Sequence, residues 1–214
     1  MIIMSKIYII GVGPGSAEYI TFAAKNAVKT ADVTIGSQRA MDLFSEANEK
    51  IVFNVKNLTE HLEKAVVMAE NGTSVCLLST GDPGFSGLLK PIKRIIKEQN
   101  CDNVELEVVP GISSLQLCAA RLEISWDEAD ILTYHGRENS TDVINILDNG
   151  RATIMLPSRS VADMASFLIK NGVDENRKVV VCERLSYPEE KIVETTLGEV
   201  VDSEFTYMCI MVIY

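Results

Sequence analysis

The residues best suited to chemistry stand where an apolar stretch breaks into a glycine-rich turn. Residues 75–78 are apolar, and Ser79-Thr80-Gly81-Asp82-Pro83-Gly84 follows them with one carboxylate, two hydroxyls and two glycines. A buried strand that ends in this way delivers its backbone and the Asp82 carboxylate to the carboxyl edge of a sheet, where open α/β sheets bind ligands. A plain Asp-Pro turn accounts for the same residues, and both interpretations stay open for this stretch alone.

A second turn of the same style lies further along the chain. Pro110-Gly111 ends an alternating stretch, and Ser113 and Ser114 stand where a helix is expected to begin. A serine there caps the helix N-terminus. It can also hydrogen-bond a ligand carboxylate or ribose hydroxyl. Both roles remain open from the residues.

The glycine loop Gly11-Val12-Gly13-Pro14-Gly15-Ser16 begins like a dinucleotide-binding fingerprint. Ser16 occupies the place of the third glycine, and Pro14 removes a backbone N–H from the loop that should cradle a pyrophosphate. The acidic residue that should end the second strand is Asp32, which precedes that strand. We therefore reject a nicotinamide-binding module, and a tight turn without a ligand is the competing interpretation of this loop.

A further candidate group is His135-Gly136-Arg137, which follows a predicted strand. An arginine at a strand's carboxyl end is well placed to bind an anion. A solvated loop is the alternative interpretation.

The elements that must position these residues alternate between strand and helix in the first half, which predicts a mostly parallel sheet. The predicted strands are 7–10, 33–35, 51–53, 75–79 and the alternating, edge-like 104–109. The predicted helices begin at Thr21, cover 39–49 and 58–69, and run from 88 to a stop at Asp102-Asn103.

The second half predicts a mixed sheet, and we place two α/β lobes at residues 1–112 and 113–214. Strands are expected at 129–134, 152–156 and 179–182, with helices at 143–147 and 161–168. Residues 192–196 and 207–213 are expected to close the lobe as antiparallel strands, with a turn at 197–200 between them.

Composition excludes several classes of protein. The chain has 214 residues and a formal net charge of −10, which argues against nucleic acid as a partner. Five cysteines without a Cys-x-x-Cys pair indicate a reducing cytoplasm and no disulfides. Two histidines without zinc-like spacing give no metal site. No leader is visible, and no apolar run approaches the ~20 residues of a membrane span.

Taken together, the motifs resemble the tetrapyrrole methylases, which methylate corrin and siroheme precursors with S-adenosylmethionine. The resemblance covers the whole chain and rests on residues 11–16, Ile20-Thr21, 80–83 and 109–114 in this order. Within the family, residues 35–39, 79–84, Trp126-Asp127 and 134–137 favour methylation at C5 of cobalt-precorrin-7. The chain ends at Tyr214, so we expect a separate protein to carry out the C(15)-methylating, decarboxylating step.

The resemblance implies two α/β lobes with the cofactor in the cleft between them, S-adenosylhomocysteine as product, and a homodimer. The implied cofactor contacts are Pro14, Thr80, Gly81, Asp82, Phe85, Ser113, Ser114, Leu156 and Leu185. The implied contacts to the carboxylate-rich tetrapyrrole are Gly13, Arg39, His135 and Arg137. The implied reaction is direct displacement, in which a ring carbon of the substrate attacks the methyl group on the sulfonium sulfur. Such a reaction requires mainly that the protein align the methyl donor and the ring carbon. No catalytic base is assigned. A methylase acting on another ring carbon and a non-catalytic corrinoid- or S-adenosylmethionine-binding protein are the alternatives.

Overall fold

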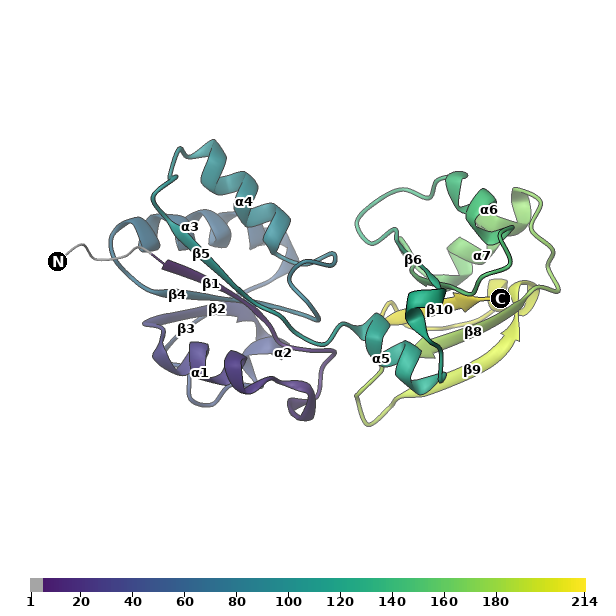
Figure 1. The fold of residues 1–214 in the computed structure, drawn as a ribbon, viewed down its shortest axis with the longest axis horizontal. Coiled ribbons are helices and arrows are strands. Elements are labelled where there is room, and N and C mark those ends of the chain that lie inside the picture. The colour runs from purple at the N-terminus through teal and green to yellow at the C-terminus, as the bar shows by residue number, and fades with distance from the viewer. Residues whose placement is uncertain (1–5) are drawn as a thin grey trace. The chain divides into compact units, whose positions relative to one another are not determined.

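The computed structural model describes residues 6–214, which form two compact units (Figure 1). The first unit ends at Ser113, and the second spans Ser114–Tyr214. Each unit has a sheet and a hydrophobic core of its own, so each is described by itself.

The first unit is a parallel sheet in the strand order β3-β2-β4-β1-β5. Its strands are β1 (Lys6–Gly11), β2 (Val33–Ser37), β3 (Glu49–Phe53), β4 (Val75–Ser79) and β5 (Glu105–Val109). Its helices are α1 (Phe22–Thr30), α2 (Gln38–Met41), α3 (Leu58–Glu70) and α4 (Leu89–Glu98), with 3-10 turns at Ala17–Tyr19 and Val55–Asn57. The predicted mostly parallel sheet is confirmed, and β5 is an edge strand as its alternation indicated.

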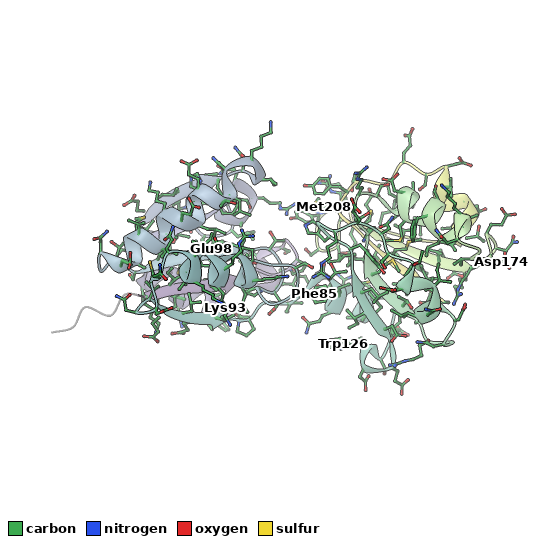
Figure 2. All side chains as sticks on the ribbon, turned by 90° about the horizontal axis from the view of Figure 1, so that it is seen from above. Phe85, Lys93, Glu98, Trp126, Asp174 and Met208 are labelled. Carbon is green, nitrogen blue, oxygen red and sulfur yellow. The ribbon has the colours of Figure 1, made fainter. Side chains whose placement is uncertain are left out.

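The central strands are mostly apolar because helices cover both faces of this sheet. Ile9 and Leu77 pack with α3 and α4 on one face. Ile10 and Leu78 pack with α1 and α2 on the other. On the outer side of α4, the charged side chains of Lys93 and Glu98 point away from the core (Figure 2).

Two predicted helix boundaries are wrong. The helix predicted at 39–49 ends at Met41, and Glu49 already begins β3, because five residues of β3 pair with β2. Sheet pairing there overrides local helix preference. The stop predicted at Asp102-Asn103 falls earlier, since α4 ends at Glu98 and Asn100 adopts a φ of 55°, a left-handed conformation that asparagine tolerates.

Local signals located other boundaries correctly. The Thr21 hydroxyl accepts a hydrogen bond from the Ala24 N–H at 3.1 Å and caps α1 as predicted. Helix α3 stops at Asn71-Gly72, where Gly72 has a φ of 87°, the backbone conformation for which glycine is favoured after a helix.

An ion–hydroxyl contact ties the start of β2 to the start of β4. Asp32 Oδ2 accepts the Ser74 N–H at 2.8 Å and the Ser74 hydroxyl at 2.6 Å. The Ser74 hydroxyl oxygen in turn accepts the Asp32 N–H at 2.9 Å. These hydrogen bonds, first of all the one from the Ser74 hydroxyl, hold the pKa of the Asp32 carboxyl below its usual value.

Asp32→Asn is therefore expected to lower the free energy of unfolding by about 1 kcal/mol near neutral pH. Because the folded-state pKa is lowered, the carboxylate's contribution is present above the unfolded-state pKa of about 3.9. It is lost as the pH falls through the lower folded-state pKa. Urea unfolding of both proteins between neutral and acid pH measures the difference. A gap that stayed constant down to the acid end would contradict this role.

The second unit contains the predicted mixed sheet. Its strand order is β6-β7-β10-β8-β9. Its strands are β6 (Asp130–Thr133), β7 (Thr153–Leu156), β8 (Lys178–Glu183), β9 (Lys191–Thr196) and β10 (Cys209–Ile213). Its helices are α5 (Ser114–Arg121), α6 (Asp142–Leu147), α7 (Val161–Lys170) and α8 (Leu197–Val201), with a 3-10 turn at Trp126–Glu128. Strands β6 and β7 are parallel, and β10 is antiparallel to both β7 and β8.

The turn predicted at 197–200 is wrong, because these residues form helix α8. A capping box starts it: the Thr196 hydroxyl accepts the Glu199 N–H, and the Glu199 carboxylate accepts the Thr196 N–H. The two closing strands are also not neighbours, because β8 lies between β9 and β10 and is antiparallel to each.

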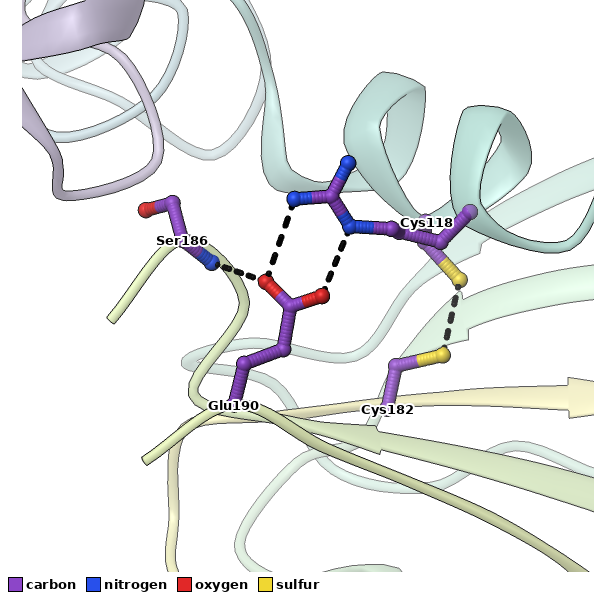
Figure 3. A network of polar contacts seen from close by, with 5 residues as sticks. Cys118, Cys182, Ser186 and Glu190 are labelled. Atoms are coloured by element: carbon purple, nitrogen blue, oxygen red, sulfur yellow. Dashed lines mark hydrogen bonds and ion pairs between the residues drawn. The ribbon is translucent and has the colours of Figure 1, made fainter. Parts of the chain in front are cut away.

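All five cysteines are buried, and each has a free thiol in the structure. Burial raises the pKa of the Cys76 and Cys209 thiols to about 12, so both stay protonated near neutral pH. Cys118 on α5 and Cys182 on β8 lie with their sulfur atoms 3.5 Å apart (Figure 3). The hydrogen bond with Cys182, followed by burial, raises the pKa of the Cys118 thiol. This contact shows that α5 covers the face of the sheet on which Cys182 lies.

Candidate functional site

Three candidate loops meet at the carboxyl edge of the first sheet. Strands β4, β1 and β5 are parallel neighbours, so the loops that follow them leave from the same edge. These are the glycine loop after Gly11, the loop that begins at Thr80 and the turn that begins at Pro110. The fold therefore brings together three motifs that are far apart in the sequence.

The three loops approach so closely that side chains are excluded between them. A Cβ atom at Gly111 would lie 2.4 Å from the Gly81 carbonyl oxygen and 2.6 Å from the Gly11 carbonyl carbon. A Cβ atom at Gly11 would lie 2.3 Å from the Gly111 nitrogen. Glycine at these positions is thus required by backbone packing.

Backbone hydrogen bonds join the first two loops. The Gly81 N–H donates to the Gly13 carbonyl at 2.8 Å, and the Gly13 N–H donates to the Gly81 carbonyl at 3.3 Å. The Val12 N–H donates to the Ser79 carbonyl at 3.0 Å. Both Gly13 and Gly81 have positive φ angles, 79° and 68°. The sheet is in effect extended past its edge by a short antiparallel bridge.

Asp82 joins the second loop to the third. Its Oδ1 accepts the Gly84 N–H at 2.8 Å, and its Oδ2 accepts the Gly111 N–H at 3.2 Å. Hydrogen bonds to an ionised carboxylate are stronger than neutral ones. Asp82 therefore fixes the Pro110-Gly111 turn against the loop after β4, a role that its position in the sequence did not reveal.

Ser79 is a positioning residue that the sequence analysis did not single out. Its buried hydroxyl accepts the Leu88 N–H at 3.2 Å, and the Leu89 N–H donates to the Pro83 carbonyl at 3.2 Å. A Cβ at Gly87 would lie 2.6 Å from the Ser79 hydroxyl oxygen. These contacts close the loop that carries Phe85, which is half-buried. The sequence signal was the serine directly after four apolar residues.

The structure leaves room beside Gly81. A Cβ built there would meet only the Ser113 Cα within 4 Å, at 3.8 Å. Gly81 and the Ser113 backbone of the same unit are therefore neighbours, with open space at the glycine. Thr80 is exposed, and Ser113 and Ser114 are half-buried. Hydroxyl groups beside open space suit a ligand that carries hydroxyl, amino and carboxylate groups.

The charges of the three loops favour a cationic ligand over an anionic one. Residues 11–16, 79–88 and 110–114 contain no lysine, arginine or histidine, and their one ionisable side chain is Asp82. A pyrophosphate would meet no cation in these loops, whereas a sulfonium or ammonium group would be favoured by the nearby carboxylate. The residues present fit S-adenosylmethionine, which is cationic and carries no phosphate.

The remaining predicted residue of the first unit, Arg39, lies on α2 directly after β2. Strand β2 is parallel to β4, so Arg39 belongs to the same carboxyl edge of the sheet. Its side chain is half-buried.

In the second unit the predicted residues also gather at one edge of the sheet. Strands β6 and β7 are parallel, and β7 and β8 run the same way because both are antiparallel to β10. Leu156 ends β7, His135 and Arg137 follow β6, and Leu185 follows β8. His135 and Arg137 are exposed, whereas Leu185 is buried.

Within residues 6–214, no group of three or more histidine, cysteine, aspartate or glutamate side chains could hold a metal ion. No helix in that same range is both long and apolar enough to cross a membrane.

Comparison with known proteins agrees with this fold. Residues 6–201 match the family model of the Tetrapyrrole (Corrin/Porphyrin) Methylases. The chain therefore belongs to the tetrapyrrole methylase family, which confirms the resemblance seen in its motifs.

Individual relatives refine this picture. The chain is 40% identical over 209 residues to the probable cobalt-precorrin-7 C(5)-methyltransferase of Methanocaldococcus jannaschii, covering 96% of each chain. It is 30% identical to the cobalt-precorrin-4 C(11)-methyltransferase of the same organism, covering 92% of this chain and 81% of the relative. The crystal structure of uroporphyrin-III C-methyltransferase from Thermus thermophilus, complexed with S-adenosylhomocysteine, matches with a TM-score of 0.76 at 24% identity, covering 97% of this chain and 91% of the other.

Proposed function

We propose that this protein is an S-adenosylmethionine-dependent methyltransferase that methylates C5 of cobalt-precorrin-7 in cobalamin biosynthesis. The observation that carries the proposal is the 40% identity to the named C(5)-methyltransferase, which extends over 96% of both chains. The carboxyl edge of the first unit supports it independently, because its three loops offer hydroxyls, open space beside Gly81 and one carboxylate without any cation of their own.

We propose that the cofactor contacts are Pro14, Thr80, Gly81, Asp82, Phe85, Ser113 and Ser114, together with Leu156 and Leu185 of the second unit. When bound, S-adenosylmethionine supplies an electrophilic methyl group on a cationic sulfur. Asp82 lowers the electrostatic cost of holding that cation and fixes the Gly111 turn. The hydroxyls of Thr80, Ser113 and Ser114 serve as donors and acceptors for the polar groups of the cofactor. The protein's contribution is therefore chiefly alignment, which can be worth ~7–11 kcal/mol.

For the tetrapyrrole, we propose contacts from Gly13, Arg39, His135 and Arg137. Corrin precursors carry many carboxylates, and the two guanidinium groups can bind carboxylates in a bidentate manner. Gly13 offers backbone that lies directly beside Gly81. Cobalt would enter as part of the substrate, so the chain needs no ligands for it.

We further propose a homodimer in the cytoplasm that works beside a separate C(15)-methylating, decarboxylating enzyme. The support for the separate enzyme is that the Methanocaldococcus relative, matched over 96% of its length, is named for C(5) alone. Size-exclusion chromatography with light scattering tests the dimer.

The experiment that tests the function uses S-adenosylmethionine labelled with ¹³C in its methyl group. The purified protein is incubated with this donor and cobalt-precorrin-7, and the product is examined by NMR. One labelled methyl group on C5 is expected. A label on another ring carbon would show that the enzyme methylates a position other than C5. The 30% identical C(11)-methyltransferase would then be the leading model for its specificity. Absence of methylated product would contradict the enzymatic assignment.

A further inference from the structure

The loop after β8 carries backbone strain on both sides of Leu185. Arg184 has a φ of 50° and Ser186 a φ of 72°, both in the left-handed region that non-glycine residues avoid. Such a conformation is unfavourable and persists only where its surroundings maintain it. Backbone strain of this kind collects at ligand-binding sites.

One carboxylate contacts the strained backbone. Glu190 Oε2 accepts the N–H of the strained Ser186 at 2.7 Å (Figure 3). The Arg121 guanidinium holds the same carboxylate at both oxygens. The Arg121 Nε lies 2.6 Å from Oε1, and a terminal nitrogen lies 3.4 Å from Oε2. The hydrogen bond from Arg121 keeps the pKa of Glu190 below its usual value, so the carboxylate is ionised near neutral pH.

Backbone hydrogen bonds hold the loop at Arg184, Tyr187 and Glu190. The Arg184 N–H donates to the Met208 carbonyl at 2.9 Å, just before β10. The Tyr187 N–H donates to the Arg184 carbonyl at 3.0 Å, and the Glu190 N–H donates to the Tyr187 carbonyl at 3.0 Å. The Arg121–Glu190 pair thus connects this closed loop to the last residue of α5.

The exposure of the pair argues for a local role. The Arg121 side chain is 38% exposed and the Glu190 side chain 21%, and ion pairs near the surface contribute little to global stability. The pair does contact the backbone next to Leu185 through the Ser186 N–H, and Leu185 is 5% exposed. Leu185 lies at the carboxyl edge of its sheet, where β6 and β7 also end.

We propose that Arg121 and Glu190 are positioning residues for the cofactor: they hold residues 184–190 in the one conformation in which Leu185 and the adjoining backbone bind S-adenosylmethionine. The inference rests on the proposed function, and it assigns a role to two residues that contact the cofactor only through the loop. Binding energy is gained because the loop is already ordered before the cofactor arrives.

The test is a double-mutant cycle read out by titration calorimetry with S-adenosylhomocysteine. Glu190→Gln keeps an oxygen for the Ser186 N–H but loses the charge, and Arg121→Met removes the guanidinium. Each single variant is expected to bind roughly tenfold more weakly, and the double variant no more weakly than the worse single one, because the two side chains act as one unit. Arg121→Lys, which restores the charge without the fork, should recover part of the affinity.

A matched control removes a comparable charge from an exposed pair. Glu194 on β9 contacts Lys178 on β8 at 2.8 Å, with side chains 68% and 52% exposed. Glu194→Gln should bind S-adenosylhomocysteine like the parent protein. Amide hydrogen exchange in the absence of ligand gives a second readout, in which Ser186 should exchange faster in Glu190→Gln and Arg121→Met but not in Glu194→Gln.

The outcomes separate this inference from the function on which it rests. If the parent protein binds and the Arg121 and Glu190 variants bind equally well, the positioning role is wrong while the proposed function stands. If the losses of affinity of the two single variants add up in the double variant, Arg121 and Glu190 do not act as one unit, and the proposal is likewise contradicted. If the parent protein does not bind at all, both are wrong. Loss of affinity with Ser186 exchange unchanged would also contradict positioning through the loop.

Discussion

Asp82→Ala is expected to lower the affinity for S-adenosylhomocysteine by about a hundredfold. The variant loses two charge-assisted hydrogen bonds, to the Gly84 and Gly111 N–H groups, each worth about 1.5–3 kcal/mol. At the lower end of this range the two bonds sum to about 3 kcal/mol. Because the ligand must then order the turn on binding, this loss corresponds to roughly a hundredfold in affinity, since 1.4 kcal/mol is tenfold. The Gly111 turn, which adjoins Ser113, then loses its attachment to the loop after β4. Titration calorimetry with the two proteins measures the effect.

Two further variants show whether the carboxylate or only its shape matters. Asp82→Asn keeps one amide oxygen as an acceptor but loses the charge, and we expect an intermediate loss of about tenfold. Asp102→Ala removes an exposed carboxylate from the same unit and should leave affinity unchanged. A folded Asp82→Ala protein that bound the ligand like its parent would overturn the role given to Asp82.

Gly111→Ala is the second large effect, and here the expected loss is in stability. The new Cβ would lie 2.4 Å from the Gly81 carbonyl oxygen and 2.7 Å from the Gly11 Cα. Both neighbours are backbone atoms of loops tied to adjacent strands, so neither can move without disturbing the sheet edge. We expect a loss of about 3 kcal/mol in the free energy of unfolding, the upper end of what overpacking costs. Urea unfolding measures this loss, and ligand binding should fail with it.

Gly198→Ala is the matched control, because its Cβ would meet the Glu175 carbonyl oxygen at 3.4 Å without a positive φ. It lies in α8, where alanine is the better helix former, so stability should be unchanged or slightly higher. Gly81→Ala tests backbone strain without steric overlap, because there is space for a Cβ atom at this position but the φ angle is 68°. This left-handed conformation should lower the free energy of unfolding of the variant by about 1 kcal/mol. Equal stability of Gly111→Ala and Gly198→Ala would contradict the packing of the three loops.

The sequence predicted the sheet and its loops because those signals are local. Apolar stretches such as residues 75–78 end at glycine-rich turns, and the parallel order of β4, β1 and β5 then brings the turns together. The Thr21 cap and the Asn71-Gly72 stop are likewise encoded within a few residues. The candidate residues of the first unit, including Thr80 and Asp82, could therefore be named without the structure.

Predictions that depended on distant partners were less successful. Residues 39–49 have helical character, yet pairing with β2 makes Glu49–Phe53 a strand. Residues 197–200 resemble a turn because of Gly198, but a capping box reaching back to Thr196 starts a helix there. Sheet pairing and capping override the local preference in these two cases.

The positioning residues of both sheet edges were invisible to the sequence for the same reason. The sequence predicted Asp82 as a ligand contact, but not its hydrogen bond to Gly111, which spans 29 positions. Arg121 and Glu190 are 69 positions apart, and nothing in their immediate neighbours marks either of them. Their partnership follows from the packing of α5 beside the loop after β8.

The most direct test of the account is calorimetric titration of the purified protein with S-adenosylhomocysteine, with NADH as the control ligand. The three loops, which carry one carboxylate and no cation of their own, predict binding of S-adenosylhomocysteine with a dissociation constant on the order of 1 μM and no binding of NADH. Binding of NADH alone would contradict the account, because a pyrophosphate would then occupy an edge that we hold to be unsuited to it. Binding of neither ligand would contradict the assignment of this edge as a cofactor site.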